Sequence, residues 1–262
     1  QQDFAEVRRI SPDSPFTHEQ QLPVSMKNPR LLLTAFLTCC MTAAPQNAAA
    51  QSPMRTSSSV PPQVELMYVK GLRYLQNAQK TDGTYDGTYG REPGIIGFCL
   101  MSVLAHGDDP NAGPYATMVR RCVDYILSRQ NKVSGYIGDS MYNHGFATLA
   151  LAEAYGMVRD DRIGPALRKA VTLTLTAQKK NKTGGWRYSP ESTDADSTVT
   201  GCQIVSLFAA RNAGIPVPDE AFERGLKYMA SCRDKKGAYG YTGPAGPRVT
   251  LTAIGSLTLS LA

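Results

Sequence analysis

The sequence lacks the short motifs that mark several common classes of enzyme and binding protein. It shows no glycine-rich phosphate-binding loop, no Ser-His-Asp arrangement and no motif of a DNA- or RNA-binding module. Cysteine is scarce, with six in 262 residues, and no two of these cysteines form a C-x-x-C pair. A zinc ribbon and a thioredoxin-type redox site are therefore excluded.

The net charge of +6 does not point to a nucleic-acid partner. Lys and Arg are scattered along the chain, and the two tight groups, at 179–182 and 233–236, lie where we expect helices to end. Cations at a helix C-terminus are favoured by the helix dipole, so a solvated helix end accounts for both groups. We therefore predict no nucleic-acid binding.

The N-terminal region has the pattern of an export signal. Residues 1–25 are polar, show no helical period and are expected to be unstructured. A basic stretch at 26–30 is followed by an apolar run at 31–44 and then by small residues, which is the order found in secretory signal peptides. The run is too short for a permanent membrane anchor. We predict a signal peptide at 26–50, a Ser/Pro-rich linker at 51–63, and a periplasmic or secreted protein.

Four cysteines lie outside the predicted signal peptide: Cys99, Cys122, Cys202 and Cys232. The first three fall within apolar helical patterns, where a free cysteine acts as a small hydrophobic residue. An oxidising compartment permits disulfides, but the spacing assigns no pairs. We expect buried thiols.

A repeat of about 50 residues is the strongest pattern in the chain. Each unit contains an amphipathic segment that ends in Gln, then a Gly-aromatic turn, then a more apolar segment. Gln79, Gln130 and Gln178 mark three units, and Cys232 takes the place of Gln in the fourth. A period of this length is typical of helical-pair repeats. The units cover about 64–107, 110–157, 161–214 and 218–262, with turns at Gly83-Thr84-Tyr85, Gly135-Tyr136, Gly184-Gly185-Trp186 and Gly237-Ala238-Tyr239.

The two segments of each unit predict different surroundings. The first has a single apolar stripe, as at 119–127, which buries one face of a helix and exposes the other. The second is apolar nearly all round, as at 95–101, so it must be covered on both sides. Gly107, Gly156 and Gly214 fall where these apolar helices should end. We predict an all-α fold, an α/α toroid with an inner ring of apolar helices and an outer ring of amphipathic ones.

The turns resemble the repeat motif of a known superfamily. Residues 79–85 are similar to the Q-x-x-x-G-x-W motif of squalene and oxidosqualene cyclases, with Tyr85 in place of Trp, and 182–188 keep Trp186. Over about 64–262 the chain resembles the squalene-cyclase and prenyltransferase repeat superfamily of terpenoid cyclase-like toroids, in an exported bacterial form. Toroids of that superfamily close with more helical pairs than the four predicted here. We therefore expect further sequence or oligomerisation to complete the ring.

A carboxylate motif precedes the third apolar helix. Residues 194–198, Asp-Ala-Asp-Ser-Thr, are similar to the D-x-D-D-T motif of class II terpene cyclases, in which the middle Asp protonates the substrate. The resemblance implies that Asp196 is the general acid and Asp194 its neighbour, while Ser197 replaces a further Asp of the motif. Such chemistry needs a carboxylic acid kept protonated by burial and adjacent carboxylates. The alternative is that Asp196 caps the helix.

His144 lies at the start of the second apolar helix, where a toroid would place it at the same end as Asp196. It could hydrogen-bond that carboxylate, bind a ligand, or satisfy local hydrogen bonds. The prenyltransferase relatives hold zinc with an Asp, a Cys two residues later and a distant His. Here the residue two positions after Asp196 is Thr198, so the resemblance implies no zinc site. The thioester motif of complement proteins is also missing, and we predict no metal and no cofactor.

Two functions remain open at this stage. In the first, the chain is an exported toroid that binds a hydrophobic, isoprenoid-type ligand or an unidentified protein partner without catalysis. Peripheral contact with a membrane would be compatible with this function. In the second, the chain is a class II terpene or squalene cyclase-like isomerase that uses Asp196, with Asp194 and His144 nearby. Export and the altered acid motif favour the first.

Overall fold

The structure of the chain is a computed structural model that describes residues 60–261. The predicted upstream segment, the predicted signal peptide and most of the predicted linker lie outside the described residues. Within 60–261 the secondary structure is helical, with isolated β-bridges and no β-strand, so the all-α prediction is confirmed. The helices are α1 (Pro62–Ala78), α2 (Pro93–His106), α3 (Ala116–Ser128), α4 (Met141–Ala154), α5 (Ile163–Lys180), α6 (Ser197–Asn212), α7 (Asp219–Ser231) and α8 (Val249–Ser260).

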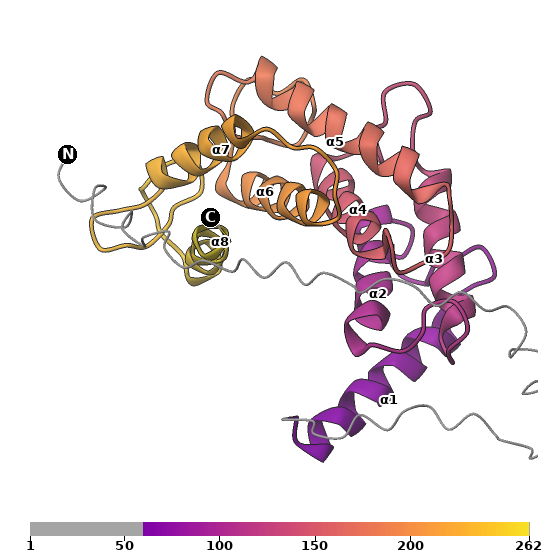
Figure 1. Ribbon diagram of the computed structural model, residues 1–262. Helices are drawn as coiled ribbons and strands as arrows, with labels where there is room; N and C mark the ends of the chain where they lie inside the picture. The colour runs from indigo at the N-terminus through magenta and orange to yellow at the C-terminus, as the bar shows by residue number, and fades with distance from the viewer. Residues whose placement is uncertain (1–59, 262) are drawn as a thin grey trace, which may run out of the picture. The chain divides into compact units, whose positions relative to one another are not determined.

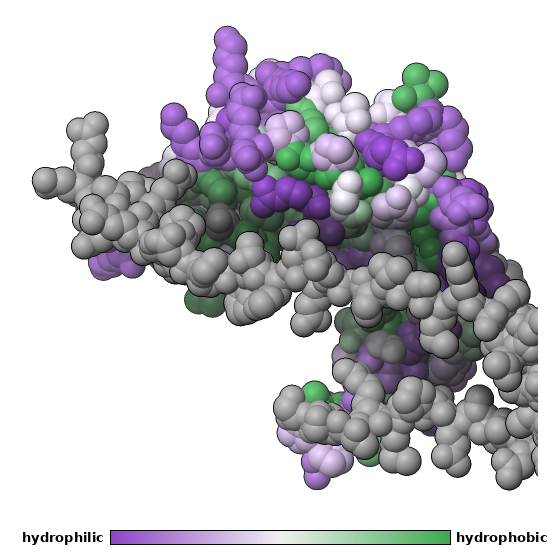
Figure 2. Space-filling view, viewed as in Figure 1, coloured by the Kyte–Doolittle hydropathy of each residue, from purple (hydrophilic) through white to green (hydrophobic). Residues whose placement is uncertain are grey.

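The even-numbered helices α2, α4, α6 and α8 form a central row in which each helix packs against the next (Figure 1). The odd-numbered helices α1, α3, α5 and α7 form an outer layer, and each packs against the central helix that follows or precedes it. Hydrophilic side chains cover much of the surface over α5 and α7 in Figure 2. The amphipathic and the apolar segments of the repeat thus occupy different layers.

The burial of the helices follows the sequence pattern. Helix α3 buries one stripe and exposes the opposite face, as expected for a helix with a polar side. Helices α4 and α6 bury residues on most sides, because central-row neighbours lie on two sides and an outer helix on a third. Close packing in the row requires glycine. A Cβ on Gly145 of α4 would lie 2.5 Å from Cys202 Sγ of α6, and one on Gly201 of α6 would overlap Ile254 of α8.

The helix ends agree with the sequence signals. Gly107, Gly156 and Gly214 follow α2, α4 and α6 and all have positive φ angles, between 86° and 91°. The four cysteines outside the predicted signal peptide are buried and free, as expected for side chains that pack as small hydrophobic groups. No helix in 60–261 has the length and apolar character needed to cross a membrane.

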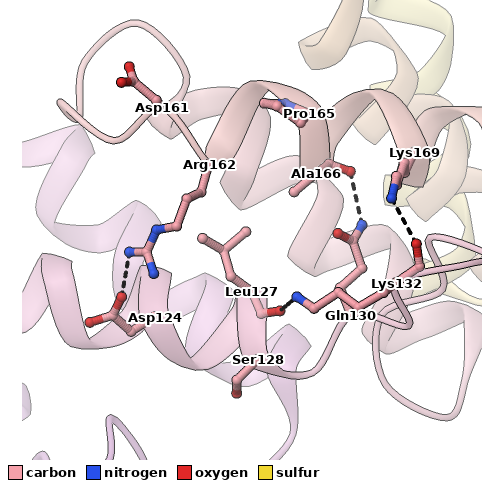
Figure 3. Close-up of a pocket in the computed structure, with 10 residues that line it drawn as sticks. All are labelled: Asp124, Leu127, Ser128, Gln130, Lys132, Asp161, Arg162, Pro165, Ala166 and Lys169. Atoms are coloured by element: carbon pink, nitrogen blue, oxygen red, sulfur yellow. Dashed lines mark hydrogen bonds and ion pairs between the residues drawn. The ribbon is translucent and has the colours of Figure 1, made fainter.

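The recurring Gln residues link successive repeats. The amide nitrogen of Gln130 donates to the carbonyl of Gly135, in its own turn, at 3.0 Å and to the carbonyl of Ala166, in α5, at 2.9 Å (Figure 3). The side chain is buried, so these carbonyls have no access to water through that position. The same pair of bonds joins Gln79 to Gly83 and Met118, and Gln178 to Gly184 and Ala221.

The turn glycines are fixed by both conformation and space. Gly135 has φ of 80°, in the left-handed region that other residues rarely adopt. A Cβ at this position would lie 2.6 Å from the carbonyl oxygen of Lys169 in α5. Gly83 meets Arg121 of α3 in the same way, at 2.5 Å. These two turns therefore lie directly against the next outer helix.

We predict that Gly135→Ala lowers the free energy of unfolding by more than about 2 kcal/mol, because it combines backbone strain with a clash against Lys169. Gly156→Ala is the matched control, since Gly156 has φ of 91° but no atom within 4 Å of the point that an added methyl group would occupy. We expect it to cost about 1 kcal/mol, the conformational part alone. Urea unfolding of the two variants measures the difference, and equal losses would show that the contact with α5 is unimportant.

Candidate functional site

Asp196 is the N-cap of α6. Its Oδ1 atom accepts hydrogen bonds from the backbone nitrogens of Thr198 and Val199, at 2.9 and 2.8 Å, and from the Thr198 hydroxyl at 2.6 Å. The residue is fully buried. These bonds satisfy two of the donors that a helix N-terminus leaves unpaired. Asp196 therefore caps α6, which is one of the two roles that the sequence left open for it.

The second carboxylate oxygen of Asp196 has a different environment. No hydrogen-bond donor in the described part of the chain reaches Oδ2, although this atom is buried. The nearest cation is Arg187, whose Nε lies 3.8 Å away. The same guanidinium forms an ion pair with Asp194, Nη1 to Oδ2, at 2.9 Å. Arg187 thus brings together the two aspartates that the sequence singled out.

Aromatic rings surround this guanidinium. Arg187 Cζ lies 5.1 Å from the ring centroid of Tyr188 and 5.6 Å from that of Tyr241, within the range of cation–π attraction. The hydroxyls of these two tyrosines are hydrogen-bonded to each other. Tyr142 of α4 is hydrogen-bonded to the hydroxyl of Thr198, so α4 and the start of α6 are joined here.

The aromatic side chains continue from this point toward α2. The ring centroids of Tyr188 and Tyr142 lie 6.0 Å apart, and those of Tyr142 and Phe146 lie 6.5 Å apart. The ring centroid of Phe146 lies 4.5 Å from that of Phe98 in α2. We call Phe98, Phe146, Tyr142 and Tyr188 the aromatic row. Phe98 is 43% exposed and Tyr188 46% exposed, unusually high for large aromatic side chains beside an apolar helix row. The row is therefore a surface that water reaches.

A cavity of about 360 Å³ opens beside the aromatic row, at the N-terminal ends of α2 and α4. Three members of the row line it, together with Tyr89 and Ile95. Its polar side chains include Glu92, Asp139 and Asn143. A partly apolar cavity of this size with a few convergent polar groups has the composition of a small-ligand site. We call it the α2–α4 pocket.

His144 makes no hydrogen bond to Asp196. Its Nδ1 accepts from the backbone nitrogen of Ile137 at 3.2 Å, so Nε2 carries the hydrogen and lies 3.1 Å from the carbonyl of Ala170 and 3.0 Å from the Thr174 hydroxyl. Burial lowers the pKa of the imidazole to about 4. Of the three roles that the sequence left open for His144, the structure shows local hydrogen bonding, because the ring joins α4 to α5 as a neutral group.

A larger groove of about 750 Å³ lies between α3 and α5 (Figure 3). Several of its polar side chains are engaged with the protein itself. Arg162 pairs with Asp124, Lys132 donates to the Leu127 carbonyl, and Lys169 donates to the Lys132 carbonyl. The groove also contains the Gln130 link between repeats. The α2–α4 pocket is the better candidate for a ligand.

The described residues hold no group of three or more His, Cys, Asp or Glu side chains placed to bind a metal ion. The site residues that sequence reasoning missed are Arg187, Glu92, Asp139 and the aromatic row. Arg187 directly follows the turn residue Trp186, so its place in the turn before α6 was available from the repeat, while its contact with Asp196 was not. No comparable sequence pattern singled out Glu92 and Asp139, because they belong to different repeats and their spacing matches no known motif.

We predict that Asp196→Ala lowers the free energy of unfolding by about 1–2 kcal/mol through loss of the N-cap. Asp196→Asn keeps an oxygen acceptor at Oδ1 and should cost clearly less. Asp194→Ala serves as control, because the Asp194 side chain is 67% exposed and its ion pair with Arg187 is worth under about 1 kcal/mol. Chemical denaturation of the three variants gives the order. Equal losses for Asp196→Ala and Asp194→Ala would contradict the capping role.

His144 should make stability depend on pH. Its pKa is about 4 in the folded chain against 6.5 unfolded, so the unfolded state binds the proton more readily between these values. The stabilisation is complete above pH 6.5 and falls as the pH drops toward 4. Between pH 7 and pH 5 the native sequence should lose about 2 kcal/mol more than His144→Gln, which keeps a donor and an acceptor. Parallel pH profiles for the two proteins would refute a buried neutral imidazole.

Comparison with known proteins does not place the chain in a family. A scan against protein-family models gave no match, and a search of curated proteins gave none. The resemblance to squalene cyclases and prenyltransferases therefore depends on the repeated Gln and Gly-aromatic turns and on residues 194–198. Membership of that superfamily stays a prediction. The candidate site is described from the distances and burial of its own residues.

Proposed function

We propose that the chain is an exported toroid domain of the squalene-cyclase and prenyltransferase type that binds a hydrophobic, isoprenoid-type ligand without catalysis. The observation that carries the binding proposal is the α2–α4 pocket with the aromatic row beside it. Ligand sites are commonly apolar cavities of roughly 300–1,000 Å³ with a few polar groups that orient the ligand. Burying the exposed faces of Phe98 and Ile95 against an apolar ligand would be favourable at about 25 cal/mol per Å².

The toroid part of the proposal is supported by how the repeats are joined. Three turns use the same Gln and glycine contacts to dock on the next outer helix. The central helices pack in sequence order with one outer helix beside each. Continued regularly, such helical pairs form a curved double layer. The predicted superfamily has this architecture.

The absence of catalysis is supported by the use of Asp196 as a cap. Three donors already bind its Oδ1, and the Arg187 guanidinium lies close to its Oδ2. An oxygen that accepts three hydrogen bonds at the start of α6 serves the fold, and this structural use of Asp196 supports a binding function. The isomerase alternative retains one supporting observation, which is that Oδ2 is buried and accepts no hydrogen bond.

Binding can be tested with farnesol, an uncharged isoprenoid alcohol, by isothermal titration calorimetry on the 262-residue chain. We expect Phe98→Ser to weaken binding about tenfold, the effect of losing roughly 1.4 kcal/mol of apolar contact. Val133→Ser is the control, since Val133 is 94% exposed and does not line the pocket. Binding that is unchanged in Phe98→Ser, or absent in the native chain, would contradict the proposed site.

Catalysis is tested separately by incubation with squalene, oxidosqualene and geranylgeranyl diphosphate, with product detection by gas chromatography and mass spectrometry. We expect no cyclised product. A cyclised product that disappears in Asp196→Asn would establish the isomerase alternative, because that variant keeps the cap acceptor but cannot supply the acid proton.

A further inference from the structure

The α2–α4 pocket contains two carboxylates from different repeats that meet at one amide. Asn143 Nδ2 donates to Asp139 Oδ1 at 3.0 Å and also to Glu92 Oε2, while Asn143 Oδ1 accepts from the backbone nitrogen of Gly94 at 3.1 Å. Both carboxylates are therefore within hydrogen-bonding reach of a single nitrogen atom. Like charges held this close repel each other, and the repulsion is relieved most simply by a cation.

No side chain of the described residues supplies that cation. The lining of the pocket contains neither Lys nor Arg, and within 60–261 neither Glu92 nor Asp139 forms a salt bridge. Glu92 is the N-cap of α2, and Asp139 comes just before the N-cap of α4, so both lie near positive helix ends. Each helix end is equivalent to about half an elementary charge. Two full negative charges against two such ends leave about one negative charge that no described side chain balances, while Asp139 is also exposed to solvent.

The remaining lining suits an organic cation better than a hydrated metal ion. Tyr89, Phe98, Tyr142 and Phe146 line the same cavity as the two carboxylates. Aromatic rings attract ammonium groups through their negative faces, and they offer no oxygen ligands of the kind that hard metal ions require. The exposed Ile95 and Phe98 extend the apolar surface beyond the charged end.

We propose that the ligand of the α2–α4 pocket is a cationic amphiphile, an ammonium group attached to an apolar body, with the ammonium between Glu92 and Asp139 and the apolar part along Phe98 and Phe146. This inference rests on the proposed binding function and specifies the chemistry of its ligand. It differs from an uncharged isoprenoid ligand in requiring the two carboxylates.

The test compares three chain-matched probes on the 262-residue protein by isothermal titration calorimetry, below their micelle concentrations. Octyltrimethylammonium carries the cation, octanol is neutral, and octyl sulfate is anionic. The double variant Glu92→Gln, Asp139→Asn removes both charges but leaves oxygen acceptors for Asn143. The control is Asp161→Asn, which removes an exposed carboxylate outside this pocket. Circular dichroism confirms that each variant is folded.

We expect octyltrimethylammonium to bind at least about tenfold more tightly than octanol, and octyl sulfate to bind more weakly than either. The double variant should bind the ammonium and the alcohol equally, while Asp161→Asn should retain the preference. Equal affinity of the native chain for the cation and the alcohol would overturn the inference and leave the proposed binding function standing. If no octyl compound binds, this inference fails, while the farnesol titration decides the proposed binding function separately.

Discussion

The buried hydrogen bonds of the Gln side chains are the interaction on which the rest of this structure depends. One amide nitrogen of Gln130 satisfies a carbonyl in its own turn and a carbonyl in the next outer helix. A buried carbonyl left without a partner costs about 1–3 kcal/mol, so each Gln couples the geometry of one repeat to the position of the next. Since the contact recurs at Gln79 and Gln178, the relation between neighbouring units is nearly the same along the chain. Cys232 occupies the corresponding position of the fourth unit and is also fully buried.

This coupling explains where the candidate site is formed. The turn that each Gln holds leads into the loop before the next central helix. Successive loops meet the start of the preceding central helix, since the backbone nitrogen of Met141 donates to the carbonyl of Tyr188 and that of Ser197 to the carbonyl of Tyr241. Trp186 anchors one of these turns by donating from Nε1 to the carbonyl of Thr174 at 2.9 Å, which fixes the next residue, Arg187, beside Asp194 and Asp196. Glu92 and Asp139 come from the two preceding loops. A regular scaffold therefore presents side chains from several repeats to a common surface.

The surface has opposite electrostatic character at its two ends. Near α6, the Arg187 guanidinium is balanced by two aspartates and covered by tyrosine rings. Near α2, two carboxylates share one amide and have no basic partner among the described residues. The aromatic row connects these ends without a break in ring contacts. A ligand that spans the row would thus be oriented by charge at the α2 end and by aromatic contact along its length, with no chemical step required of either.

The sequence by itself determined the local features of this protein. The 3.6-residue period and the turn glycines predicted the all-α class, the ends of α2, α4 and α6, and the two kinds of helix, because backbone periodicity and left-handed turns are set by neighbouring residues. The capping role of Asp196 was available for the same reason. The partners of side chains were decided only by the tertiary structure. The sequence left three roles open for His144, and the structure shows that its ring bonds to α5. Glu92 and Asp139 converge on Asn143 although 47 residues separate them. Such contacts depend on how closely whole helices approach one another. Glycines such as Gly145 permit the close approach, but no local sequence pattern encodes the resulting contacts.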